Sequence, residues 1–343
     1  MLRYIFALLF MASTCLAQEP SQMDSVCKLF ETSGKFMGSV LVARGEHVVF
    51  HKSYGSADLE WNVPNTQATK FRIGSMTKQF TAAAVLILEE QDKLKIEDPI
   101  KNYLPDSPPA WDSITIYHVL THTSGLPRIN NVYEAPKLKF FPVTPEQRIA
   151  KLRNKSLEFT PGSQFKYCDS GYILLGYLIE KVSGESYQEF IQKNIFSRLG
   201  MNDSGYDSNT DIIPRRANGY SPGPKGIQNA EFIHMSVPFS SGGLYSTTGD
   251  LLRWELGLFG GKLLTAESLE KMMTPYKGEY GLGLHIKTSH GQKRISYGGE
   301  IEGFSTCIAY YPDSRITIIA LANLNGTAPQ QIVDTLAAIL HAE

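Results

Sequence analysis

Ser75 and Lys78 are three residues apart at the start of a segment with apolar side chains at helical spacing, an arrangement that can activate a nucleophile. Residues three apart on a helix lie on the same face, so the Lys78 ammonium can reach the Ser75 hydroxyl. A serine at a helix N-terminus also meets free backbone N–H groups and the positive end of the helix dipole. Because both features favour the negative charge that forms when a serine attacks a carbonyl, the pair predicts acyl transfer.

The residues around this pair distinguish it from other Ser-x-x-Lys spacings in the chain. Residues 71–73 have the character of a strand end, Gly74 permits a sharp turn, and residues 79–91 carry apolar side chains at spacings of three and four. We therefore predict that Ser75 lies where a strand turns into a buried helix. Three other pairs lack such surroundings: Ser25 with Lys28, Ser163 with Lys166, and Ser268 with Lys271.

The elements that must position this pair are β-rich at both ends of the chain and helical between them. This order predicts an α+β fold in which both termini build one mainly antiparallel sheet with flanking helices. Residues 81–232 would form an inserted helical lobe, with the site in the cleft between the lobes. Residues 202–243, rich in Gly, Pro, Ser and Asn, are predicted to be a long loop at the rim of the site. Strands are expected at 39–43, 47–50, 281–286, 294–297, 304–311 and 315–322, and helices at 115–121, 172–183, 186–199 and 330–341, with a further helix start at Thr144.

Residues 1–17 have the pattern of a signal peptide. Arg3 precedes an apolar run that is too short to span a bilayer, and small residues lead to a cleavage position after Ala17. We expect residues 18–343 to form one exported hydrolase domain, periplasmic or secreted, and they contain no second apolar run of membrane length.

Charge and cysteine content narrow the classes of partner and fold. The 343 residues carry a formal net charge of -1, with a pI near 6.7, so there is no electrostatic case for nucleic acid or an anionic membrane. Three cysteines follow the predicted cleavage position, and an odd number cannot form a closed disulfide framework. The fold is therefore expected to depend on its core, without disulfides.

Five segments in a fixed order closely resemble the motifs of the serine β-lactamase and penicillin-binding protein superfamily, in particular its class C β-lactamase-like serine hydrolases. The resemblance runs from about residue 36 to the C-terminus. It implies the β-lactamase/transpeptidase fold and an acyl-enzyme that cleaves a small ester, amide or peptide without metal or cofactor. The segments are Ser75-Met76-Thr77-Lys78, Thr121 to Pro127, Tyr167-Cys168-Asp169, Ser241-Gly242-Gly243, and Tyr297-Gly298-Gly299-Glu300.

The resemblance also implies a role for each matching residue. Ser75 would be the nucleophile, and Lys78 and Tyr167 would share the general-base work, because an ammonium beside a phenol favours the phenolate. The backbone N–H groups of Ser75 and Glu300 would form the oxyanion hole.

Two residues depart from the family pattern. The second motif usually ends in Asn, whereas an ionised Asp169 only accepts hydrogen bonds and would hold Lys78 as the ammonium. Tyr297, just before Gly298 and Gly299 of the substrate-binding strand, stands where β-lactamases and transpeptidases carry the lysine that anchors the substrate carboxylate. We therefore expect the better substrates to be uncharged esters, amides or peptides. Whether Tyr297 takes part in catalysis or only lines the site stays open.

Several alternatives have to be weighed. If Arg294 or a residue at the rim supplied the missing charge, the protein would be a β-lactamase or a DD-carboxypeptidase acting on penicillins or cell-wall peptides. It could also be a non-catalytic binding or sensor protein on the same fold. His118 and His122 lack the acidic residue of a zinc motif, so no metal is expected. Cys168 has no histidine close in sequence and is not the expected nucleophile.

Overall fold

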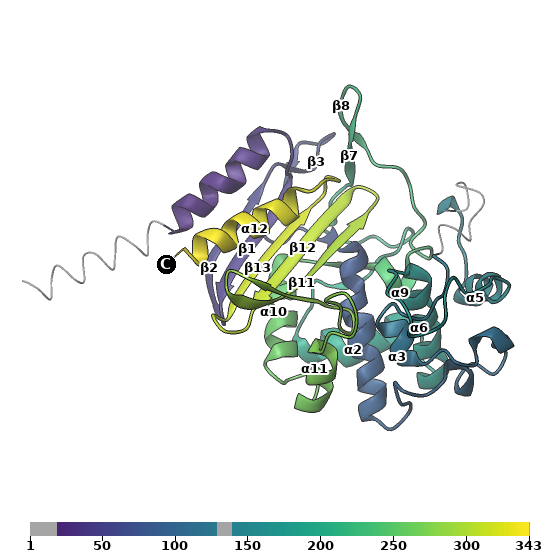
Figure 1. The fold of residues 1–343 in the computed structure, drawn as a ribbon. Helices are drawn as coiled ribbons and strands as arrows, with labels where there is room; N and C mark the ends of the chain where they lie inside the picture. The colour runs from purple at the N-terminus through teal and green to yellow at the C-terminus, as the bar shows by residue number, and fades with distance from the viewer. Residues whose placement is uncertain (1–18, 129–138, 343) are drawn as a thin grey trace, which may run out of the picture.

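The computed structural model describes residues 19–128 and 139–342 (Figure 1). The signal peptide at residues 1–17 lies outside the described residues and stays a prediction. In the part of the chain that is described, no helix is both long and apolar enough to cross a membrane.

A six-stranded antiparallel sheet joins the two ends of the chain. Its strand order is β10-β11-β12-β13-β1-β2, so the C-terminal strand β13 pairs directly with the N-terminal strand β1. The prediction of one sheet built from both termini is therefore confirmed. The strands are β1 (Gly38–Arg44), β2 (His47–Tyr54), β10 (His285–Ser289), β11 (Gln292–Ile301), β12 (Phe304–Tyr311) and β13 (Ile316–Ala322).

The sheet is covered on both faces. Successive side chains of a strand point to opposite sides, so alternate residues of one strand belong to different cores. In β13, Ile318 and Ala320 belong to one core, and Ile319 and Leu321 belong to the other. The first core also contains α12 and a helix at residues 19–32, which lie side by side in Figure 1. The second core contains α2 and α10. Burial on both faces explains why β13 is apolar at every position except Thr317.

The helices of the other lobe pack around α6, which contacts α2, α3, α5, α7 and α9. The start predicted at Thr144 is confirmed, because the Thr144 side chain accepts the Gln147 N–H and the Gln147 side chain accepts the Thr144 N–H. The helices are α2 (Thr77–Glu90), α3 (Ile116–Leu120), α5 (Pro145–Arg153), α6 (Asp169–Ser183), α7 (Tyr187–Ile191), α8 (Ser197–Leu199), α9 (Phe239–Gly242), α10 (Thr248–Phe259), α11 (Ala266–Met273) and α12 (Ala328–Leu340). Single turns are η1 (Gly74–Met76), η2 (Ile100–Asn102), η3 (Pro109–Trp111) and the π turn η5 (Gln192–Phe196), and short strands are β3 (Ser56–Asp58), β4 (Val63–Pro64), β5 (Phe71–Arg72), β6 (Gly205–Tyr206), β7 (Tyr220–Gly223), β8 (Gly226–Asn229) and β9 (Leu244–Ser246).

Three predictions about elements were wrong or incomplete. The strand expected at 281–286 begins only at His285, because Gly283 turns with φ +70° against α2, where a Cβ would lie 2.8 Å from the Lys78 carbonyl oxygen. The segment 202–243 is no plain loop, since it contains β6, β7, β8 and α9. The helix at 19–32 and α10 were not predicted, although both cover the sheet.

Candidate active site

Ser75 lies where a short strand turns into a buried helix, as the sequence predicts. β5 ends at Arg72, Gly74 has φ +51°, and Ser75 occupies the turn η1 directly before α2. A side chain at Gly74 would have its Cβ 2.8 Å from the Glu300 backbone nitrogen, so glycine lets the turn approach β11 closely. The turn therefore places Ser75 beside the sheet edge, and Lys78 in the first turn of α2.

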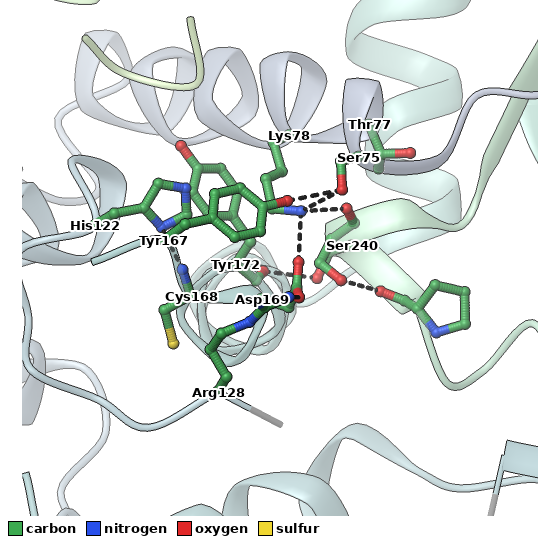
Figure 2. Close-up of polar contacts among 12 residues, drawn as sticks. Ser75, Thr77, Lys78, His122, Arg128, Tyr167, Cys168, Asp169, Tyr172 and Ser240 are labelled. Atoms are coloured by element: carbon green, nitrogen blue, oxygen red, sulfur yellow. Dashed lines mark hydrogen bonds and ion pairs between the residues drawn. The ribbon is translucent and has the colours of Figure 1, made fainter. Parts of the chain in front are cut away.

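Ser75, Lys78 and Tyr167 converge through their polar atoms (Figure 2). The Ser75 hydroxyl oxygen lies 2.7 Å from the Tyr167 hydroxyl oxygen, and the Lys78 ammonium donates to the Ser75 oxygen at 3.1 Å. The Lys78 nitrogen also lies 4.8 Å from the centre of the Tyr167 ring. The structure thus brings together three residues that are up to 92 positions apart in the sequence.

Lys78 is fully buried, and each of its three N–H donors has an acceptor. Besides Ser75, it donates to the Asp169 carboxylate at 2.9 Å and to the Ser241 carbonyl oxygen at 2.8 Å. Burial alone would lower the pKa of Lys78, but the Asp169 carboxylate and the Tyr167 hydroxyl outweigh burial and raise it. Lys78 is therefore held as the ammonium. This was expected, because Asp169 supplies a carboxylate where the family pattern usually has an asparagine.

Asp169 is the first residue of α6, and Cys168 is the N-cap. Burial alone would raise the pKa of Asp169, but the charges of Lys78 and Arg128 outweigh it and hold that pKa well below its usual range. The Cys168 thiol donates to the Leu126 carbonyl oxygen, and burial raises its pKa to about 11. Cys168 is therefore a protonated, structural thiol at neutral pH.

Arg128 is a cation at the site that the sequence interpretation did not single out. One of its terminal nitrogens donates to Asp169 at 3.2 Å, and its guanidinium lies 5.5 Å from the centre of the Tyr167 ring. Its side chain is 41% exposed and lines the site cavity. The only hint in the sequence is its position, directly after the segment that ends at Pro127.

Tyr297 is buried and belongs to a chain of polar contacts that runs away from Lys78. Its hydroxyl oxygen lies 3.0 Å from that of Tyr280, which lies 3.1 Å from Nε2 of His122. Nδ1 of His122 accepts the Cys168 backbone N–H at 3.1 Å. Burial, then the nearby Tyr167, raises the pKa of Tyr297 well above its ordinary value. Tyr280 and His122 were not predicted as parts of the site.

Two cavities meet at Ser75, Tyr167 and Glu300. The larger, about 550 Å³, lies against α6 and α9. Its lining combines apolar side chains with the charged residues Arg128, Arg148, Asp169, Glu300 and Glu302. The smaller, about 350 Å³, follows β11 and is lined by Tyr297, Gly298 and Gly299. β10 pairs with β11 only from Gln292 to Ser296, so residues 297–301 of β11 present an edge that β10 does not cover. A substrate can therefore lie along this edge with one half in each cavity.

The other candidate groups lie elsewhere or serve the fold. Arg294 is buried and donates to Asp334 of α12 at 2.6 Å, so it is not the missing anchor. Nδ1 of His118 accepts the Thr115 N–H in the cap of α3. Within residues 19–128 and 139–342, no three His, Cys, Asp or Glu side chains are grouped so that they could hold a metal. Cys27, Cys168 and Cys307 are buried and unpaired.

Comparison with known proteins places this geometry in a family. Residues 28–343 match the Beta-lactamase family. Penicillin-binding protein 4* of Bacillus subtilis (strain 168) is 32% identical over 320 residues, which cover 86% of this chain and 70% of that protein. The octameric penicillin-binding protein homologue from Pyrococcus abyssi superposes with a TM-score of 0.83 at 30% identity, over 94% of this chain and 77% of that one. A D-amino acid amidase from Ochrobactrum anthropi SV3 shares the fold, with a TM-score of 0.82 at 21% identity over 94% of this chain and all of that one. The resemblance noted in the sequence is thus confirmed, and the chain belongs to the Beta-lactamase family, in the serine β-lactamase and transpeptidase superfamily.

Proposed function

We propose that the protein is an exported serine hydrolase that cleaves an ester or an amide bond through an acyl-enzyme on Ser75. One observation carries this proposal: the Ser75 oxygen lies 2.7 Å from the Tyr167 oxygen and 3.1 Å from the Lys78 nitrogen. A nucleophile with its base at this distance is the usual sign of covalent catalysis. A binding or sensor protein would not need all three groups to converge.

The hydrogen bonds around Ser75 give a direction for proton transfer. The Lys78 ammonium uses one N–H on the Ser75 oxygen, so the Ser75 hydrogen is left to donate to Tyr167. In the proposed first step, Tyr167 acts as the phenolate: Ser75 attacks the substrate carbonyl, and its proton passes to the phenolate oxygen, which becomes a neutral hydroxyl. Tyr167 then returns this proton to the leaving oxygen or nitrogen as the substrate bond breaks.

The charges around Tyr167 support its role as the proton acceptor. Lys78 and Arg128 lie 4.8 and 5.5 Å from the centre of its ring, and both cations stabilise the phenolate that accepts the proton. The backbone N–H groups of Ser75 and Glu300 would stabilise the oxyanion of the tetrahedral intermediate. A water molecule would release the acyl group by the same steps, with Tyr167 accepting its proton.

The substrate side of the proposal depends on charge. Tyr297 supplies no fixed positive charge, and the Glu300 carboxylate, without an ion pair among the described residues, lines both cavities. We therefore propose uncharged esters, amides or peptides as the better substrates. The D-amino acid amidase with the same fold supports amides as one class to test.

A second candidate, β-lactamase or DD-carboxypeptidase activity, is favoured by Arg128. Its guanidinium lines the larger cavity, where it could bind a substrate carboxylate, and the likeness to penicillin-binding proteins makes penicillins a reasonable ligand to test. However, Asp169 already neutralises much of this charge at 3.2 Å.

One panel tests both candidates. Nitrocefin, a D-Ala-D-Ala peptide, D-amino-acid amides and short-chain p-nitrophenyl esters should be compared on the wild type and on Ser75→Ala. We expect the esters or amides to be turned over fastest, and Ser75→Ala to lose that turnover. Nitrocefin turnover that exceeds ester turnover by a wide margin would favour a β-lactamase instead.

A further inference from the structure

His122 is held in a single tautomer by a backbone hydrogen bond. The Cys168 N–H donates to Nδ1 of His122 at 3.1 Å, so Nδ1 must carry a lone pair. Burial, with the nearby Lys78 charge, lowers the pKa of His122 well below its ordinary value, so the ring is neutral and its proton is on Nε2. His122 also has φ +56°, a conformation that a non-glycine residue keeps only where its surroundings determine it.

The Nε2 proton sets the direction of the contacts that follow. Nε2–H donates to the Tyr280 oxygen at 3.1 Å. The Tyr280 O–H then has the Tyr297 oxygen as its acceptor at 3.0 Å. Tyr297 thus accepts a hydrogen bond from Tyr280, and its own O–H has no acceptor among the described residues. Tyr297 lines the cavity of about 350 Å³ that also contains Ser75 and Tyr167.

We infer that His122 and Tyr280 are positioning residues, which fix the Tyr297 hydroxyl as a hydrogen-bond donor to an acceptor oxygen of the substrate. This inference rests on the proposed function and adds a specificity-determining contact to it. Tyr297 stands where β-lactamases and transpeptidases carry a lysine and related esterases and peptidases often carry histidine, so an oriented O–H takes the place of the lysine charge. The substrate group in the smaller cavity is therefore one with a carbonyl, ether or nitro oxygen, which needs no negative charge.

We call the hydrogen bonds from His122 through Tyr280 to Tyr297 the relay. A double-mutant cycle tests it on p-nitrophenyl methoxyacetate, which carries an acceptor oxygen on each side of its ester. We expect Tyr297→Phe to lower kcat/KM about three- to tenfold, mainly through KM, as for the loss of one hydrogen bond to bound substrate. Tyr280→Phe should lower it less, and adding it to Tyr297→Phe should change nothing further, because it acts through Tyr297. Additive losses, or no effect of Tyr297→Phe, would overturn the inference.

Tyr103→Phe is the matched control for this cycle. The Tyr103 O–H donates to the Asp98 carboxylate at 2.5 Å, and Tyr103 lines neither cavity and contacts none of His122, Tyr280 and Tyr297. Its effect should therefore add to that of Tyr297→Phe. A fluorophosphonate should label Ser75 in every variant. If it fails to label Ser75 in the wild type, the proposed function is wrong, whereas intact labelling with an additive cycle contradicts only the relay.

The tautomer of His122 gives a test that does not depend on turnover. Proton–nitrogen correlation spectra of the histidine rings, assigned with His122→Gln, should show a neutral ring protonated at Nε2 in the free protein. This state should persist in Tyr280→Phe, because the Cys168 N–H still fixes it. A ring protonated at Nδ1 would reverse the relay and refute the inference.

Discussion

The Lys78 nitrogen and the Asp169 carboxylate form an ion pair of 2.9 Å directly beneath Ser75 (Figure 2). The family pattern usually has an asparagine at this position. Its amide oxygen would accept a hydrogen bond from Lys78 without adding a negative charge. Asp169 instead stabilises the protonated form of Lys78 and leaves Tyr167 as the group that can accept the Ser75 proton.

Replacing Tyr167 by phenylalanine should remove the proton acceptor and keep the ring over Lys78. Because general-base groups contribute about 10²–10⁴ in rate, we expect kcat to fall by about that factor while the melting temperature changes little. Tyr103→Phe is the matched control, since the Tyr103 hydroxyl donates to Asp98, away from the cavities. A loss in Tyr167→Phe no larger than in the control would remove Tyr167 from the mechanism.

The Asp169→Asn variant tests which protonation state of Lys78 is active. Removing the carboxylate lowers the raised pKa of Lys78, so the ammonium is lost at a lower pH than in the wild type. The fall of kcat/KM on the alkaline side should therefore shift to lower pH. If Lys78 acted as a neutral base, the variant would instead gain activity near neutral pH, which would contradict the account.

Stability should respond to the same substitution in a defined pH window. The pKa of Asp169 is held below its ordinary 3.8. Its contribution to the free energy of unfolding is therefore fully present above pH 3.8 and is lost as the pH falls further. The pKa of Lys78 is raised above 10.5, so its contribution is present below pH 10.5 and is lost at higher pH. Asp169→Asn should lower the unfolding midpoint most between these two values.

Gly74→Ala should damage the site by two routes. The residue has φ +51°, and the new Cβ would lie 2.8 Å from the Glu300 nitrogen, so the turn must move away from β11. Strain of this kind costs about 1–3 kcal/mol, and a displaced Ser75 should cost roughly a hundredfold in kcat/KM. Gly184→Ala has a similar φ of +76° with open space around its Cβ, so it should lose stability but keep activity. Equal activity in the two variants would show that the close approach is unnecessary.

Glu255 provides a pH-dependent prediction far from Ser75. Burial raises its pKa from 4.5 to about 8, so the folded protein keeps a proton that the unfolded chain releases. Wild-type stability should therefore fall as the pH rises from 4.5 to 8, and Glu255→Gln should remove that fall. Thermal unfolding at pH 5 and pH 8.5 measures this, with the exposed Glu270→Gln as a control. If the unfolding midpoints of wild type and Glu255→Gln changed equally between pH 5 and pH 8.5, Glu255 would not be a buried neutral carboxyl.

The sequence predicted the parts of the fold and site that depend on local pattern. Strands with alternating or continuous apolar residues, the glycine turn before Ser75 and the order of the motifs were all sufficient for this. The helix at 19–32 was missed because its role is to cover the sheet, and the strand at 281–286 was placed too early because Gly283 packs on α2. These are contacts between distant segments, which no local pattern encodes.

The same limit applies to the residues of the site. Arg128, Tyr280 and His122 are ordinary polar and aromatic residues in sequence, and only folding brings them against Tyr167 and Tyr297. Arg294, by contrast, looked like a substitute anchor but pairs with α12. The charge of each side chain is known from the sequence, whereas the direction in which it points is known only from the structure.

Covalent labelling tests the central claim most directly. Wild type and Ser75→Ala should be treated with a fluorophosphonate, digested and analysed by mass spectrometry, in parallel with p-nitrophenyl ester hydrolysis. We expect one adduct on the peptide that contains Ser75, and neither adduct nor hydrolysis in Ser75→Ala. An adduct at Ser163 or Ser268, or hydrolysis that survives Ser75→Ala, would contradict it.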